Sequence, residues 1–524
     1  MGDVPRERLS VRDGSGKIAF PCGYSVWDGK TKFTFLNETH ELETANDWNN
    51  AEWKKLWLYN LHYFDCLRQE EGEGEPSARV PTKRMEARAG DASARAPTKR
   101  MEARALIERW IAENPVGKGN GWEPYPISLR VVNWIKWLVR VGGGADGDCA
   151  LPSLVVQVRW LRKRLEYHLL ANHLLANAKA LVFAGKFFRG EEADEWYRKG
   201  MAIYRKELPE QVLEDGVHFE RSAMYHLILL EDVLDCYNFT GEEIFKTYAA
   251  KMLGALRLLV GPDGKIVKFN DAAEGIALPV ERVREYAREV GVEEVEEVEG
   301  ARTRQSGFVR LEKGEVCVIA KMGEIGPSYQ PGHAHADTGT FELWKGTRKV
   351  IADTGTDRYV VDDERKRQRG TAAHNCVMID GKDSSEVWAG HRVARRARVV
   401  GMKNEELRMK NLARGDGDAG IEGKYRDCHG FEIARRLEVT DSGVMVKDEI
   451  WGKGEHEVEL RWHLAPGVRA DEVRVMCRMG DEEVGCVTEA CWVCEEFGRE
   501  VQSSVVIARK RVRLPVVIGW DVFC

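Results

Sequence analysis

The segment PGHAHADTGTFEL carries residue types that suit either a metal site or acid–base catalysis. Its two histidines, His333 and His335, are two positions apart, so on a β-strand their imidazoles would face the same side. The run that follows, TFELWKGTRKVIAD, is typical of a β-hairpin that turns at KGTR. This hairpin is expected to bring Asp353 back opposite Thr340, close to the histidines.

Two interpretations of this segment stay open from the residue pattern. His374, in AAHNCVMID, is expected on a following strand, and two imidazoles with one carboxylate on adjacent strands form a set that zinc accepts. The alternative is a group of hydrogen-bonded core histidines without a metal. A metallo-β-lactamase type of HxHxD motif is disfavoured, because that motif continues with another histidine and here Thr338 follows Asp337.

Two helical segments contribute further polar candidates. ANHLLANAKAL carries Asn172 and His173, and DGVHFERSAMYHLILL carries Arg221, Tyr225 and His226. Taken singly, each is more often structural, since an asparagine on a helix commonly bonds locally and a tyrosine commonly packs its ring in the core. A function for them needs support beyond their own positions.

The elements that must position these residues change along the chain. Residues 50–290 contain long runs with helical spacing of apolar residues, among them EWKKLWLYNLHYFDCLR, PISLRVVNWIKWLVRV, LVVQVRWLRKRLEYHLLANHLLANAKALVFAGKFF and HFERSAMYHLILLEDVLDCY. Pro126 suits a first helical turn, and Gly185 is a candidate helix end. Consecutive helices rich in Trp and Tyr favour helical hairpins packed in a ring or array.

Within this helical region a short sequence is duplicated. SARVPTKRMEARA at 77–89 returns as SARAPTKRMEARA at 93–105 with one difference. Two copies are too few for a repeat array. We therefore expect a surface loop that carries no chemistry.

Beyond the acidic linker GVEEVEEVEG, residues 291–300, the pattern becomes β. Short alternating runs such as EVCVIAKMG, HNCVMIDGKD, FEIARRLEVT, GVMVKDEIW and EVELRWHLAPG are bounded by Gly and Asp. Helices first and strands second favour an α+β chain with two separate layered domains. A junction between domains is a favoured place for a binding cleft.

Composition limits the function classes. The 524 residues are 43% apolar and 31% charged, which is typical of a soluble globular protein, and the length predicts two or three domains. A net charge of −6 argues against nucleic acid as the main partner but permits an anionic substrate in a local basic cleft. No apolar run is long enough to predict a membrane span. The charged start predicts no signal peptide and the twelve cysteines are scattered, so a cytoplasmic location is expected, with the periplasm as the alternative.

Taken together, these segments resemble the heparinase II/III-like polysaccharide lyases. The landmarks lie in the family's order along nearly the whole chain: DWNNAEWKKLWLYNLHYFDCL, NGWEPYPISLRVVNWIKW, NHLLANAKALVFAGKFF, DGVHFERSAMYHLILLEDVLD, GHAHADTGTFELWKGTRKVIADTGT and AAHNCVMIDGKDSSEVW. The resemblance implies an N-terminal segment 1–45, an incomplete (α/α) toroid over 46–290 and a C-terminal antiparallel β-sandwich domain over 301–524. It also implies an active cleft between these domains and cleavage of an anionic, uronate-containing polysaccharide or oligosaccharide by β-elimination.

The resemblance assigns roles to the polar candidates. Asn172, with neighbouring His173, matches the residue that neutralises the uronate carboxylate and so stabilises an enolate-like transition state. Tyr225 matches the catalytic tyrosine, a base for the C5 proton and an acid for the leaving oxygen. A phenol has an ordinary pKa of about 10, so Arg221 or a protonated His226 is expected to lower the pKa of this tyrosine and to contact substrate. His333 matches a histidine that assists from the sandwich domain.

The remaining implied residues bind a metal or the sugar. His335, Asp353 and His374 match the family's metal ligands, and a divalent ion, expected to be zinc, would fix the strands rather than attack substrate. Trp122 and Tyr125 could stack on sugar rings, with core packing as the equal alternative. The arginines of HRVARRAR and ERKRQRG could bind carboxylates or sulfates, against the alternative of solvated surface charge.

Two rival functions stay open. A glycoside hydrolase on the same helical scaffold would use two carboxylates, for which Asp215 and Glu220 are candidates. A non-catalytic carbohydrate-binding or assembly protein would keep the scaffold without turnover. The short helical region and the charged start favour action on oligosaccharides inside the cell.

Overall fold

The computed structural model describes residues 26–68, 92–141, 149–295, 305–400 and 419–523. Contacts divide the chain into two compact units. Unit 1 comprises residues 1–208 with 231–246, and unit 2 comprises residues 209–230 with 247–524. Among the described residues, no helix combines the length and the apolar character needed to cross a membrane.

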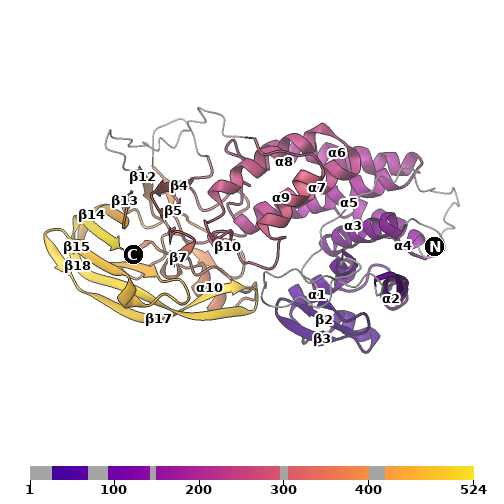
Figure 1. Cartoon of the computed structure of the whole chain (residues 1–524), viewed down its shortest axis with the longest axis horizontal. Coiled ribbons are helices and arrows are strands. Elements are labelled where there is room, and N and C mark those ends of the chain that lie inside the picture. Colours follow the sequence, from indigo (N-terminus) through magenta and orange to yellow (C-terminus); the bar gives the residue numbers. More distant parts are fainter. Residues whose placement is uncertain (1–25, 69–91, 142–148, 296–304, 401–418, 524) are drawn as a thin grey trace. The chain divides into compact units, whose positions relative to one another are not determined.

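Unit 1 contains a small antiparallel sheet and a set of helices (Figure 1). The sheet contains β1 (Val26–Trp27), β2 (Lys32–Phe35) and β3 (Glu38–Glu41) in that order. The helices are α1 (Lys55–Tyr63), α2 (Ala92–Glu113), α3 (Pro124–Val141), α4 (Ala150–Arg162), α5 (Ala171–Phe187) and most of α6 (Glu191–Gln211), with 3-10 turns at Ala45–Asn49, Asp65–Arg68 and Asn120–Trp122.

The core of unit 1 is built from aromatic rings and from α5. The ring of Trp110 lies 5.8 Å from that of Trp122 and 5.6 Å from that of Trp134, measured between centroids. Almost every side chain of α5 is buried. A Cβ at Gly185 would come within 2.6 Å of the carbonyl oxygen of Ala193 on α6, so the close approach of α5 and α6 requires glycine at this position.

Several predicted helices end elsewhere. The run predicted as one helix over 154–188 forms α4 and α5, because Leu170 has a φ of 57°, outside the right-handed helical region. Likewise α1 ends before Phe64, whose φ is 61°. Gly185 lies inside α5 rather than at a helix end. The second duplicated copy, 93–105, belongs to α2 and not to a loop, since Ala, Arg, Glu and Met favour helix; the first copy, 77–89, lies outside the described residues.

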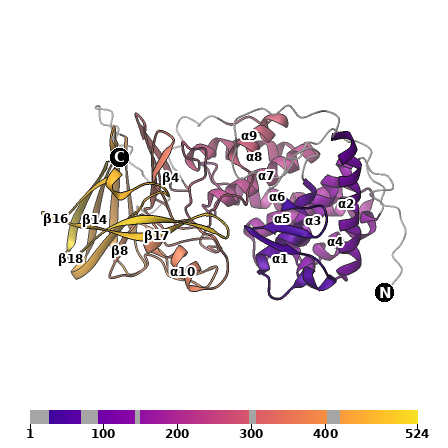
Figure 2. The ribbon, with the colours of Figure 1, turned by 60° about the horizontal axis from the view of Figure 1, so that its bottom comes forward.

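Unit 2 contains two larger antiparallel sheets and a short hairpin. One sheet has the order β4 (Phe308–Lys313), β5 (Val316–Lys321), β6 (Phe341–Lys345) and β7 (Arg348–Ile351). The nine-stranded sheet has the order β11-β12-β13-β14-β18-β15-β16, with β17 on β18 and β8 on β14; Figure 2 shows the long strands β14 and β18 side by side. Its strands are β8 (Val377–Ile379), β11 (Arg398–Val399), β12 (Ala419–Arg426), β13 (Glu432–Thr440), β14 (Gly443–His463), β15 (Arg474–Met479), β16 (Glu482–Val484), β17 (Cys486–Glu496) and β18 (Arg499–Phe523), and the hairpin pairs β9 (Val387–Trp388) with β10 (Arg392–Val393).

The two larger sheets of unit 2 share one apolar core. Buried Val318 and Leu343 of the four-stranded sheet belong to the same cluster as Leu437 and Val458 of the nine-stranded sheet. The helices of this unit are the first part of α7 (Ala223–Thr240), most of α8 (Glu243–Ala255), α9 (Val280–Glu289) and α10 (Asp363–Arg369), with 3-10 turns at Leu256–Leu258, Thr371–Ala373 and Ala470–Glu472. Helices therefore precede the strands of the two larger sheets, apart from the short α10.

The strand predictions are confirmed in outline and wrong for the histidines. The β6–β7 hairpin forms, and the Thr340 hydroxyl donates to Asp353 Oδ2 at 3.0 Å, so the predicted approach of these two residues is confirmed. A register shift between Leu343 and Trp344 means that the strand pairing does not set them directly opposite each other. His333 and His335 lie in the loop between β5 and β6 rather than on a strand, and His374 follows a 3-10 turn before β8. Hydrogen bonds of His333 and His335 to Asp271 fix the β5–β6 loop in place of strand pairing.

The change from helices to strands and the division into compact units fall at different places. The last helix before the larger sheets ends at Glu289 and their first strand begins at Phe308. Residues 209–230 and 247–289 nevertheless group with the strands in unit 2. The beginning of α7 is thus part of the same unit as the loop that carries His333.

Candidate active site

Tyr225 lies in the first turn of α7 and is held there by Ser222. The backbone N–H of Tyr225 donates to Ser222 Oγ at 3.3 Å, as at a helix N-cap. The Ser222 hydroxyl donates in turn to the carbonyl oxygen of Asp271 at 2.5 Å. The residue before it, Arg221, has a φ of 56°, so the chain turns sharply into the helix. Local backbone geometry therefore places the phenol beside the segment that carries Asp271.

The phenol of Tyr225 contacts His333 and a second tyrosine. The rings of Tyr225 and His333 are stacked with centroids 3.9 Å apart. The hydroxyl oxygens of Tyr225 and Tyr359 are 3.0 Å apart, within hydrogen-bonding distance. Burial raises the pKa of Tyr359 well above its ordinary value. This second phenol therefore stays protonated and can donate to the hydroxyl oxygen of Tyr225.

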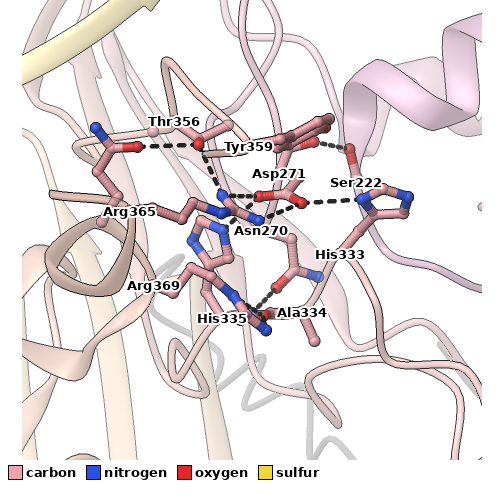
Figure 3. A network of polar contacts seen from close by, with 12 residues as sticks. Ser222, Asn270, Asp271, His333, Ala334, His335, Thr356, Tyr359, Arg365 and Arg369 are labelled. Atoms are coloured by element: carbon pink, nitrogen blue, oxygen red, sulfur yellow. Dashed lines mark hydrogen bonds and ion pairs between the residues drawn. The ribbon is translucent and has the colours of Figure 1, made fainter. Parts of the chain in front are cut away.

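The carboxylate of Asp271 contacts two histidines and an arginine, and it is fully buried (Figure 3). His333 Nδ1 lies 2.9 Å from Oδ2, and His335 Nε2 lies 2.8 Å from Oδ1. Arg365 donates to both oxygens, at 2.5 and 2.8 Å. Burial alone would raise the pKa of Asp271, but Arg365 and the two imidazoles hold it well below its ordinary value. We call Tyr225, Asp271, His333, Tyr359 and Arg365 the Tyr225 cluster.

Two of the three arginines of ERKRQRG are buried and brace the cluster, whereas Arg367 is partly exposed. Arg365 and Arg369 on α10 are fully buried. Arg365 also donates to the carbonyl oxygen of Gly390 at 3.0 Å, and Arg369 donates to those of Ala334 at 2.9 Å and Ala389 at 3.0 Å. These side chains bind protein groups, which leaves them unsuited to gripping a substrate.

The predicted metal ligands lie together and are all buried. The imidazoles of His335 and His374 have centroids 5.3 Å apart, and His374 Nδ1 lies 2.9 Å from Asp353 Oδ2. The other nitrogens, His335 Nδ1 and His374 Nε2, have no hydrogen-bond partner. Burial lowers the pKa of His335 to about 3, so it is neutral, the form that binds metals. The three side chains fit a zinc ion in ligand type and burial, but Asp353 lies at Nδ1 of His374, on the other side of that ring from the unpaired Nε2.

A second group of candidates lies in unit 1, where α5 begins. His173 Nδ1 is 3.2 Å from Glu166 Oε1, and its ring lies 4.5 Å from the ring of Tyr125. Glu166 is fixed by Asn177, which accepts from its N–H at 2.8 Å and donates to its Oε2 at 3.0 Å. Burial raises the pKa of Tyr125, and a hydrogen bond with Asn172 opposes the rise. We call Tyr125, Glu166, Asn172 and His173 the Asn172 cluster.

Three of the predicted substrate contacts are structural. Trp122 is 5% exposed, packs on Trp110 and donates to the carbonyl oxygen of Asn114 at 3.2 Å. Arg221 donates to the carbonyl oxygen of Glu324 at 2.6 Å and, more weakly, to two others.

His226 is the third predicted substrate contact that is structural. It is fully buried, and its two nitrogens contact the N–H of His218 and the carbonyl oxygen of Met252. Burial lowers its pKa to about 4. The predicted role of a protonated His226 beside Tyr225 is therefore wrong, because this imidazole is neutral at physiological pH.

The sequence predictions missed the centre of the Tyr225 cluster. Asp271 stands in KFNDAAEG and Tyr359 in DTGTDRYVV, and neither segment matches a local motif. In the sequence His391 is part of a basic run, yet its ring lies 5.0 Å from that of Tyr359 and 5.7 Å from that of His333. Only the fold brings these distant segments together.

The sequence matches two family descriptions. Residues 150–287 match the heparinase II/III N-terminus, and residues 297–520 match the heparinase II/III-like C-terminal region. Together these matches cover more than half of the chain. The chain belongs to the heparinase II/III-like family.

Curated relatives of this heparinase II/III-like chain agree with that membership. A heparin-sulfate lyase of Bacteroides stercoris is 26% identical over 330 residues, 57% of this chain and 47% of the relative. A heparin-sulfate lyase of Pedobacter heparinus is 23% identical over 316 residues, 52% of this chain and 47% of the relative. The chain thus spans about half the length of the curated relatives it matches.

Solved structures show the same fold. A crystal structure of heparinase III covers 82% of this heparinase II/III-like chain and 74% of its own, with a TM-score of 0.65 and 15% identity. Heparan sulfate lyase HepC from Pedobacter heparinus covers 94% and 81%, with a TM-score of 0.58 and 16% identity. A helical N-terminal region followed by an antiparallel sheet region is therefore shared with these proteins.

Proposed function

We propose that this protein is a polysaccharide lyase that cleaves a sulfated, uronate-containing polysaccharide or its oligosaccharides by β-elimination. The observation that carries the proposal is the Tyr225 cluster, in which a phenol is stacked at 3.9 Å on an imidazole that a buried carboxylate holds. Family membership and the lyase activity in the names of its relatives support the reaction class. The proposal includes an incomplete (α/α) toroid and a β-sandwich as the finer description of the two regions.

The reaction needs a base, an acid and a neutralised carboxylate. In β-elimination the C5 proton of the uronate leaves to the base, the C4–O bond breaks, a C4–C5 double bond forms and the leaving oxygen takes a proton. We assign Tyr225 as the group that exchanges these protons, with His333 against its ring. The hydroxyl of Tyr359, 3.0 Å away, can donate to a Tyr225 phenolate and so stabilise the deprotonated form.

Asn172 is assigned to the uronate carboxylate, with His173 beside it. An amide N–H that donates to a carboxylate oxygen favours the charge that develops there as C5 loses its proton. The hydrogen bond that His173 donates to Glu166 fixes the orientation of this imidazole. Tyr125, whose ring lies against His173, is the retained candidate for stacking on a sugar.

A zinc ion is proposed as a structural part of the enzyme. His335, Asp353 and His374 would hold it, and bound zinc would tie the β5–β6 loop to the segment before β8. The hairpin brings Asp353 to this group, where it contacts Nδ1 of His374 and the Thr340 hydroxyl. None of the proton transfers assigned above requires the metal.

The test is ultraviolet absorbance of the unsaturated uronate during incubation with heparan sulfate, heparin, chondroitin sulfate, hyaluronan and alginate, each as polymer and oligosaccharide. We expect absorbance to rise with wild type on at least one sulfated substrate, and Tyr225→Phe to lower the rate by about 10²–10⁴-fold. New reducing ends without absorbance would instead show a hydrolase. Binding without cleavage on every substrate would show a carbohydrate-binding protein.

The hydrolase alternative has a structural difficulty in one of its two carboxylates. Asp215 accepts hydrogen bonds from the N–H of Val217 and from the N–H and hydroxyl of Ser306. A carboxylate that closes a turn in this way is poorly placed to activate water. No comparable observation favours that reaction.

A further inference from the structure

Asp271 joins the two histidines that the proposed function treats separately. One of its oxygens contacts His333, the other contacts His335, and Arg365 binds both. We propose that Asp271 is a shared positioning residue, which orients His333 for the reaction and His335 for zinc. The inference rests on the proposed function and deepens it, because it predicts that metal binding and turnover depend on one carboxylate.

The hydrogen bonds define which nitrogen of each imidazole carries a proton. Arg365 donates to both oxygens of Asp271, the geometry of an arginine–carboxylate pair, and a carboxylate accepts hydrogen bonds and cannot donate them. His333 must therefore place its proton on Nδ1, which leaves Nε2 with a lone pair. His335 must place its proton on Nε2, which leaves its buried, unpaired Nδ1 with a lone pair for a metal. A carboxylate that fixes the tautomer of a ligating histidine is a common outer contact in zinc sites.

The backbone of Asp271 is fixed from the same side as Tyr225. Its N–H donates to the carbonyl oxygen of His333 at 3.0 Å, and its own carbonyl oxygen accepts from Ser222, the residue that caps α7. The preceding residue, Asn270, has a φ of 58° and accepts from the N–H of His335 at 2.9 Å. One short segment thus links the helix that carries Tyr225 to both histidines, as Figure 3 shows for the polar contacts.

The test compares Asp271→Asn with Asp448→Asn in the full-length protein. Asparagine keeps the size of the side chain, but its amide nitrogen cannot accept from an imidazole, so one histidine loses its tautomer control. Asp448 is the matched control, because it is a fully buried carboxylate bound twice by one arginine, Arg435, and touches neither histidine. The measurements are the rate of zinc release to a chromogenic chelator, the thermal midpoint, and kcat and KM on the best substrate at saturating zinc.

We expect Asp271→Asn to release zinc about 10–100-fold faster and to lower kcat by about 10–100-fold with KM within threefold. Asp448→Asn should lower the thermal midpoint alone. If Asp271→Asn does not fold, Arg365→Lys, which leaves the carboxylate but removes its two-point contact, should change both quantities in the same direction.

Two results would overturn the inference. If Asp271→Asn recovers the full kcat at saturating zinc, Asp271 acts on metal binding alone. If its rate of zinc release is unchanged, Asp271 positions His333 alone. A wild type that releases zinc slowly but forms no unsaturated uronate would instead refute the proposed lyase, and with it the His333 half. The rate of zinc release from Asp271→Asn would then test separately whether Asp271 orients His335 for zinc.

Discussion

The Tyr225 cluster and the Asn172 cluster differ in how firmly the structure holds them. In the Tyr225 cluster the carboxylate is fully buried and binds three side chains, and the phenol is 7% exposed. In the Asn172 cluster Asn172 and His173 are only partly buried, and His173 is held by a hydrogen bond to Glu166 at 3.2 Å and by its contact with the ring of Tyr125.

The difference suggests a division between chemistry and recognition. Proton transfer requires reacting groups in a narrow range of positions, which a buried ion pair can maintain. Contact with a carboxylate on a flexible polymer tolerates more motion before the sugar binds. We therefore expect changes in the Tyr225 cluster to lower kcat alone, and changes in the Asn172 cluster to alter kcat and KM together.

The largest effect outside the proposed Tyr225→Phe test is expected for His333→Ala. Removing the imidazole takes away the ring that packs on Tyr225 and the nitrogen held by Asp271. We expect kcat to fall by about 10²–10⁴-fold with KM nearly unchanged, measured by ultraviolet absorbance. His456→Ala is the control, because His456 also contacts an aspartate, Asp380 at 2.8 Å, but on the sheet. A tenfold rise in KM without loss of kcat would place His333 in substrate binding only.

Asn172→Ala should have the next largest effect. Loss of one donor to a developing charge typically lowers kcat by about 10²–10³-fold, and here KM should rise as well, because the same amide binds the ground-state carboxylate. Asn60→Ala removes a helical asparagine that bonds only to its own helix, at the carbonyl oxygen of Leu56, and should be neutral. An effect on kcat alone would remove the proposed difference between the two clusters.

A third prediction concerns acid stability and the neutral His226. Its pKa is about 4 in the folded protein against an ordinary 6.5, so between these values the unfolded chain binds the extra proton. The free energy of unfolding should therefore fall as pH decreases from 6.5 towards 4, by about 3 kcal/mol for this group, and be unaffected above 6.5.

Urea unfolding followed by circular dichroism at about pH 8, 6 and 5 would measure this dependence. In His226→Gln the slope between pH 6.5 and 4 should be smaller, although stability at pH 8 also falls. An unchanged slope would show that other buried histidines account for the acid sensitivity. His62 and His463, whose pKa values burial lowers to about 3, are the groups to change next.

The sequence predicted the type and order of the elements better than the contacts of polar residues. Helices over 50–290, the β6–β7 hairpin and the approach of Asp353 to Thr340 followed from periodicity and turn residues. Family membership was recognised from motif order and is confirmed by the family matches. The roles of the site residues, the zinc ion and the cytoplasmic location stay predictions.

The contacts that the sequence did not predict share a physical cause. Asp271, His333 and Arg365 lie about 30 to 90 positions apart, and an ion pair over such a separation leaves no periodic signal in either segment. Arg365 stands in a run of charges that is typical of a solvated surface, yet burial beside Asp271 reverses that expectation. Arg221 and His226 are predicted to contact substrate because they neighbour Tyr225 in sequence. His226, the next residue on α7, points away from Tyr225, and Arg221 lies before the helix with a φ of 56°.

The smallest effect on turnover is expected for Arg221→Lys, which tests the structural assignment directly. Arg221 donates to the carbonyl oxygens of Glu324, Gly326 and Gln305 within unit 2, and a lysine cannot reproduce this fork. We expect stability to fall by about 2–4 kcal/mol while KM stays within about twofold, because a side chain committed to backbone oxygens has little left for substrate. Arg159→Lys, in a surface pair with Glu192, should cost at most about 1 kcal/mol. A tenfold rise in KM at unchanged stability would show that Arg221 contacts substrate. Tyr225 would then have a cation beside it in the active site.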